Sequence, residues 1–205
     1  MLEVGLILSR FAHYVAVSAL FGVALFPLYG GLNRADGKSA RFFVWLPGFA
    51  ATAAVATLVA NFAWLAFTTA NMNGAMSAAL APPALWSVIQ ETSFGHVWSA
   101  RAVINIILVA ITLAHLAFRR TEPQGILVPL LSGVLLASVA GTGHTQVGGP
   151  ANGLLHVGAD AEHLLAAGAW LGGLIALAFI LRECSPAAAG VLTRFSGMGY
   201  APCRS

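Results

Sequence analysis

Residues 153–174, GLLHVGADAEHLLAAGAWLGGL, form an apolar stretch whose ionisable side chains all lie in its first half. The apolar character continues to Leu181, so the segment has the twenty or so residues that a helix needs to cross a membrane. His156, Asp160 and His163 lie within it, and ionisable groups in a membrane helix are costly and usually functional. The stretch therefore predicts a spanning helix that carries potential ligands near one end.

The composition of the whole chain agrees with a membrane location. Of the 205 residues, 59% are hydrophobic and 8% are charged, whereas a soluble domain carries about 25% charged residues. Lipid cannot pair with backbone groups, so the spanning segments should be helices. We predict an all-α fold, a polytopic membrane helix bundle formed as a single domain over residues 1–205. The net charge of +3 is scattered, and no nucleic-acid partner is expected.

Five stretches are apolar and long enough, or nearly so, to be spanning helices: Leu2–Tyr29, Phe42–Ala70, Val97–Phe118, Ile126–Thr142 and Leu154–Leu181. The first has an acidic Glu3 and no basic start, which favours a spanning helix over a cleavable signal peptide. Pro82 and Pro83 are expected to open a short amphipathic helix that reaches Gln90 and lies in the membrane interface.

The basic residues predict the orientation of these helices. They cluster in alternate connections: Arg34, Lys38 and Arg41, then Arg119 and Arg120, then Arg182 and Arg194. The other connections, 71–96 and 143–155, contain no lysine or arginine. Because cytoplasmic loops carry the excess of basic residues, we expect the N-terminus outside. Most histidines then lie in the outer half, and His115 lies toward the cytoplasm.

The outer half of the last predicted span is the candidate metal site. His156, Asp160 and His163 are spaced i, i+4, i+7 and so share one face of a helix. Two imidazoles and a carboxylate suit several transition metals. His144, in the glycine-rich segment GTGHTQVGGPANG, could fold back over this face. The alternatives are that Asp160 merely bonds a histidine, that these groups are solvated among the lipid headgroups, or that the segment around His144 is a plain flexible loop.

Three further residues are candidate ligands. Met72 and Met76 lie in the predicted outer loop, and thioethers are soft ligands for Cu(I), although such a pair also arises by chance. His13 lies close to mid-membrane beside Arg10, and both should face the interior. His13 is either a second coordination site, a relay, a haem ligand, or a buried histidine bonded to a neighbouring helix.

Other features have simpler interpretations. Arg101 is expected to extend to the lipid headgroups, and Gly172 and Gly173 are expected to let helices approach closely. Cys184 and Cys203 form neither a metal motif nor a disulfide framework. The sequence contains no nucleophile elbow, phosphate-binding loop or HExxH motif, so we do not expect an enzyme.

Several segments resemble the copper-resistance protein D (CopD) family. The most specific is HLLAAGAWLGGLIAL followed by RFSGMG, and SRFAHYVAVSALFG, ETSFGHVWSAR and GTGHTQ agree with it. The resemblance implies a multi-pass protein of the bacterial inner membrane that handles copper beside a periplasmic partner of the CopC type. Family members usually continue through more spanning helices, so this chain is expected to be truncated before a sixth helix.

Two functions are therefore expected from the sequence, beside a third interpretation in which the chain is a fragment that only anchors a partner. In the first, periplasmic copper, as Cu(I) or Cu(II), binds at the outer histidines and passes toward the cytoplasm by way of His13. In the second, the chain binds haem for electron transfer, with histidines such as His13 and His163 as axial ligands.

Overall fold

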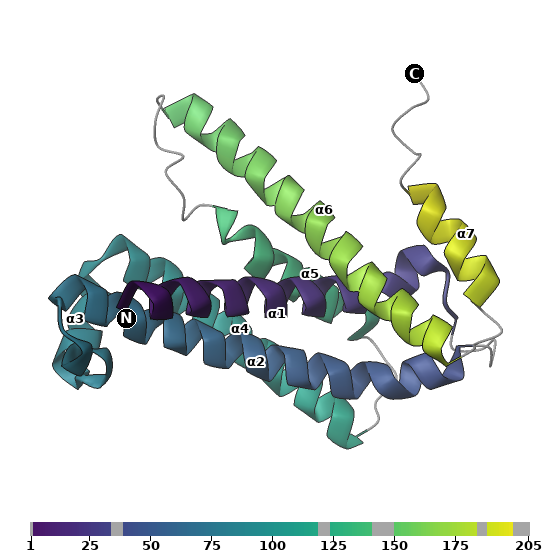
Figure 1. The fold of residues 1–205 in the computed structure, drawn as a ribbon, viewed down its shortest axis with the longest axis horizontal. Helices are drawn as coiled ribbons and strands as arrows, with labels where there is room; N and C mark the ends of the chain where they lie inside the picture. Colours follow the sequence, from purple (N-terminus) through teal and green to yellow (C-terminus); the bar gives the residue numbers. More distant parts are fainter. Residues whose placement is uncertain (1, 34–38, 119–123, 141–149, 184–187, 199–205) are drawn as a thin grey trace.

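The computed structural model describes residues 2–33, 39–118, 124–140, 150–183 and 188–198, which are almost entirely helical (Figure 1). In chain order the helices are α1 (Leu2–Gly30), α2 (Ala40–Asn73), the short 3-10 helix η2 (Met76–Leu80), α3 (Pro82–Glu91), α4 (Ser93–Phe118), α5 (Gln124–Ala137), α6 (Pro150–Arg182) and α7 (Ala188–Met198). No strand occurs within these ranges, so the predicted all-α class is confirmed.

Among the helices that the structure describes, four are long and apolar enough to cross a membrane: α1, α2, α4 and α6, the last over Leu155–Arg182. The fourth predicted span, Ile126–Thr142, corresponds to α5, which has 14 residues and is apolar over Gly125–Ala137. At 1.5 Å per residue α5 is about 21 Å long, shorter than the roughly 30 Å hydrocarbon core. The predicted polytopic helical bundle is thus confirmed, with four long helices and one short one.

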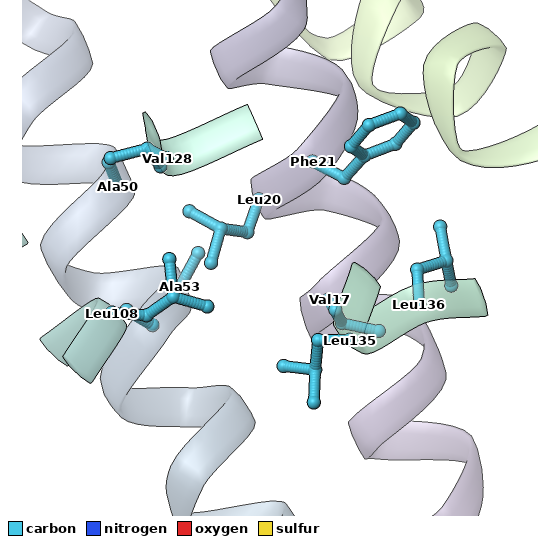
Figure 2. Packing of buried hydrophobic residues seen from close by; sticks show 10 residues of the cluster. Val17, Leu20, Phe21, Ala50, Ala53, Leu108, Val128, Leu135 and Leu136 are labelled. Carbon is cyan, nitrogen blue, oxygen red and sulfur yellow. The ribbon is translucent and has the colours of Figure 1, made fainter. Parts of the chain in front are cut away.

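Helix α1 lies between its neighbours and packs against α2, α5 and α6. A hydrophobic cluster joins α1 to α2, α4 and α5, and includes Val17, Leu20, Ala53, Leu108 and Leu135. Figure 2 shows Leu20 pointing from α1 toward Ala53 and Leu108, on the side of α1 away from α6. The cluster begins one helical turn after His13 in α1, at Val17, and one turn after Asn105 in α4, at Leu108.

Helices α1 and α6 approach so closely that their backbones touch. A methyl group added at Gly22 would lie 2.1 Å from the carbonyl oxygen of Gly168, and one added at Gly172 would lie 2.4 Å from the backbone of Gly22. The Tyr29 hydroxyl donates a hydrogen bond of 2.8 Å to the carbonyl of Ala169 across the same contact. The predicted role of Gly172 and Gly173 in close helix approach is confirmed, since Gly173 lies against Tyr29 and Phe195.

The connection between α2 and α4 folds into short helices at one end of the bundle, beside the N-terminus (Figure 1). Gly74 ends α2 in a left-handed conformation (φ 67°), and its amide bonds the last carbonyls of the helix. Helix α3 begins at Pro82, as predicted, and ends at Glu91. It packs on α4 through Val88, whereas Trp86 is 61% exposed. Its placement in the lipid interface remains a prediction.

Three of the differences between the structure and the predicted boundaries bear on the arrangement of the helices. Helix α2 begins at Ala40, so Pro47 lies inside it. Helix α5 ends at Ala137, before the predicted Thr142, and Arg101 of α4 donates to the hydroxyl and the carbonyl of Ser138 at that end. The chain also forms α7 after α6, where no helix was expected; its 11 residues span about 16 Å.

The α1–α6 contact supplies a first prediction. Replacing Gly172 with leucine should lower the unfolding free energy by about 1–3 kcal/mol, the usual cost of overpacking, since the side chain would meet backbone atoms of Gly22. Gly158→Ala is the matched control in the same helix, because a methyl group there meets nothing within 4 Å. Thermal unfolding of the detergent-purified variants measures both. Equal stability of the two variants would show that the close contact does not form.

Candidate functional site

The N-terminal half of α6 carries the predicted metal ligands on an uncovered surface. His156, Asp160 and His163 are all exposed, and the first buried residue along the described part of this helix is Gly168. In Figure 1 the N-terminal half of α6 projects away from the other helices. The stripe of two imidazoles and one carboxylate is therefore accessible to a ligand from outside the bundle.

The other predicted metal ligands, His144, Met72 and Met76, do not lie on this stripe of α6. His144 lies outside the described residues. Met72, 56% exposed, is near the end of α2, and Met76, 52% exposed, begins η2. Within the described ranges, no three histidine, cysteine, aspartate or glutamate side chains are grouped closely enough to hold a metal ion. The outer metal site therefore stays a prediction, with His156, Asp160 and His163 available to it.

His13 lies in α1 and is fully buried, and a hydrogen bond of its ring indicates which nitrogen carries a proton. Its Nδ1 lies 3.2 Å from the carbonyl oxygen of Thr57 in α2. A carbonyl only accepts, so Nδ1 carries a proton, and in the neutral imidazole Nε2 then keeps a lone pair. Nε2 is buried and has no hydrogen-bond partner in the structure. An imidazole held at one nitrogen with a lone pair at the other is in the form that binds a metal.

Trp64 of α2 lies at the centre of a group of polar side chains around His13. The ring centroids of His13 and Trp64 are 5.7 Å apart. The guanidinium carbons of Arg10 and Arg101 each lie 5.3 Å from the Trp64 ring, which is a cation–π distance. Trp64 is 1% exposed, and its indole N–H has no acceptor in the structure. Three helices thus meet at one aromatic ring.

The expectation that Arg101 extends to the headgroups is wrong. Arg101 is 1% exposed, and its Nε donates to the Ser138 hydroxyl at 2.9 Å. Its Nη2 donates to the Ser138 carbonyl. A cation at a helix C-terminus is favourable because the last carbonyls there lack partners, so Arg101 caps α5 from within the bundle. Within the described residues, no carboxylate forms an ion pair with Arg101. The ion pair in this part of the chain joins Arg41, at the start of α2, to Glu183, after the end of α6.

Two buried asparagines complete this region. Asn61 in α2 and Asn105 in α4 are fully buried, and neither side-chain amide has a hydrogen-bond partner in the structure. The Asn61 backbone carbonyl accepts a hydrogen bond of 2.9 Å from the Trp98 indole. Asn105 lies one turn from Arg101, and both face the interior. We call His13, Asn61, Trp64, Arg101 and Asn105 the polar cluster.

The sequence analysis identified His13 as a candidate but did not identify the other members of the polar cluster. The signal was present on α4, where buried residues recur at helical spacing: Trp98, Arg101, Ala102, Asn105, Leu108 and Thr112. That periodicity places Arg101 on the packed face. His163, by contrast, is exposed on α6, so the two histidines suggested as haem ligands have different surroundings.

Comparisons with known proteins show which proteins this chain is similar to in sequence. Residues 1–157 match the family model described as copper resistance protein D-like, N-terminal domain. The chain is 34% identical over 175 residues to copper resistance protein D of Pseudomonas syringae pv. tomato, covering 84% of this chain and 54% of that protein. It is 26% identical over 195 residues to inner membrane protein YebZ of Escherichia coli (strain K12), covering 93% of this chain and 64% of that protein.

The chain spans about half to two thirds of the length of these relatives. No solved structure matches it. The family match includes the polar cluster and His156, and it stops before Asp160 and His163. Together with the helical membrane bundle, the match over residues 1–157 shows that the chain belongs to the copper resistance protein D-like family.

Proposed function

We propose that the chain handles copper in the bacterial inner membrane, binding it on the periplasmic side and passing it toward the cytoplasm. The observation that carries the proposal is the accessible stripe of His156, Asp160 and His163 on α6 in a chain of a copper-resistance family. Copper is the transported ion in this proposal, and no chemical conversion by the chain is required.

Capture takes place at the outer end of α6. His156 and His163 supply imidazole nitrogens, Asp160 supplies a carboxylate or orients one imidazole, and His144 completes the set. These ligand types accept Cu(II), whereas Met72 and Met76, in the predicted outer loop between α2 and α4, suit Cu(I). Since imidazole must be deprotonated to bind a metal, copper affinity should fall as the pH drops through the histidine range.

Passage inward uses His13. It lies eleven residues into α1, about 16 Å from the start of that helix, and its buried Nε2 has no hydrogen-bond partner within the described residues, so it could serve as a ligand in the passage that we propose. Delivery to the outer ligands is assigned to a periplasmic copper-binding protein of the CopC type, which would reach the exposed half of α6.

Replacing His13 with alanine tests the passage step separately from capture. We expect copper uptake into proteoliposomes to fall on the order of tenfold or more, because a buried ligand is lost, while copper bound at the outer face is unchanged. His115→Ala is the matched control. His115 lies in the last turn of α4, and its replacement should leave uptake unaffected. Unchanged uptake in His13→Ala would remove His13 from the path.

The same preparations separate copper handling from haem binding. A protein that binds copper and shows no Soret absorption supports the proposal. A Soret band that is lost in His13→Ala would support the haem alternative instead.

A further inference from the structure

The first half of α1 has two uncovered faces of different character. Glu3, Arg10 and Tyr14 are spaced i, i+7, i+11 and so share one face of the helix. Glu3 and Arg10 are exposed, and Tyr14 is half-buried. We call these three residues the Arg10 stripe. About a third of a turn away lies an apolar face made of the exposed residues Val4, Leu8, Phe11 and Val15.

The side chain of Arg10 does not extend toward the nearby end of its helix. Arg10 lies about 12 Å along α1 from Leu2. Its guanidinium carbon is 5.3 Å from the Trp64 ring, which also lies 5.7 Å from the ring of His13 and 6.5 Å from that of Tyr14. His13 and Tyr14 are one turn further from the start of α1. The guanidinium is therefore held away from the helix end, where an arginine that reached for lipid headgroups would place it.

A charge in this position requires water. Within the described residues, no carboxylate forms an ion pair with Arg10. A cation–π contact offsets only part of the cost of a charge in hydrocarbon, so ionisable residues in spanning helices face protein or water. Protein does not cover Arg10, because its side chain is exposed. Leu8 and Phe11, close to it along the chain, are exposed and apolar, as expected where hydrocarbon borders the other face of α1.

We propose that water penetrates along the Arg10 stripe from the N-terminal end of α1 to the Trp64 ring, and that small hydrophilic solutes follow the same route. Trp64 is 1% exposed and contacts both the exposed Arg10 and the buried His13, so it marks the inner end of the route. The proposal goes beyond copper capture at α6 and does not depend on it. In the passage that we propose for copper, the route would end one aromatic ring from His13.

Cysteine labelling in proteoliposomes tests this route. Single cysteines are placed in a variant whose native Cys184 and Cys203 are serine. A charged, membrane-impermeant thiosulfonate is supplied on both sides of the membrane, so that the result does not depend on orientation. Arg10→Cys should react on the order of a hundredfold faster than Phe11→Cys, because the thiolate is the reactive form and a thiol in apolar surroundings stays protonated. Tyr14→Cys should also react faster than Phe11→Cys, and it decides the matter if Arg10→Cys does not fold.

Phe11→Cys is the matched control, since Phe11 is next to Arg10 in α1 but lies on the apolar face and is 64% exposed. His13→Cys should not react, because His13 is fully buried. Every cysteine should react after unfolding in SDS, so slow labelling in the membrane reports the surroundings of the thiol. Equal rates for Arg10→Cys and Phe11→Cys, or a His13→Cys that reacts as fast as Arg10→Cys, would overturn the proposal. The labelling needs no copper, so its outcome is separate from that of capture at α6.

Discussion

Replacing His156 and His163 together with alanine is expected to abolish high-affinity copper binding. The two side chains share one exposed face of α6, and each would supply an imidazole nitrogen to the metal. Asp160→Asn should have a smaller effect, on the order of 10–100-fold in affinity, if Asp160 orients a histidine rather than binding the ion. Equilibrium dialysis with metal analysis of the detergent-purified protein measures both affinities.

The control for this experiment is His115→Ala, which changes a histidine in the last turn of α4 and should bind copper like the parent. A double variant that also binds like the parent would place the site elsewhere. Met72, Met76 and His13 would then be the candidates to change next.

Replacing Trp64 with alanine is expected to cause the largest loss of stability, about 3–5 kcal/mol in unfolding free energy. The ring is 1% exposed and contacts His13, Tyr14, Phe94 and both nearby arginines, so its removal leaves a cavity and unpaired charge. Trp86→Ala is the matched control: Trp86 is 61% exposed on α3, and surface changes of this kind usually stay within about 0.5 kcal/mol.

Thermal unfolding in detergent compares the two tryptophan variants. Similar midpoints for Trp64→Ala and Trp86→Ala would contradict the arrangement of α1, α2 and α4 around Trp64. Trp64→Phe should lie between the parent and Trp64→Ala, because it keeps an aromatic face for the two arginines.

Much of the fold follows from apolar length alone. The spans beginning near Leu2, Phe42 and Leu154 agree with α1, α2 and α6, because about twenty apolar residues in lipid leave the backbone no alternative to a helix. Pro82 marked the start of α3, since proline fits the first turn of a helix. The glycines at 172 and 173 indicated a close helix contact, although the sequence did not say that α1 is the partner.

The site was harder to predict because it depends on which helices meet. His13 was identified since a histidine deep in a membrane helix is costly, whereas Arg101 was assigned to the headgroups on the strength of its long side chain. The fold overrides that tendency: Ser138 at the end of α5 and the Trp64 ring hold the guanidinium inside. Asn61 and Asn105 gave no signal in the sequence, and only the fold shows that both side chains are fully buried.

X-ray absorption at the copper K edge tests the central claim, copper capture by the outer histidines, most directly. The copper-loaded parent protein should show imidazole scattering from more than one histidine, and His156→Ala/His163→Ala at the same protein concentration should lose it. Copper in the parent without imidazole scattering, or an unchanged imidazole signal in the double variant, would contradict capture at α6.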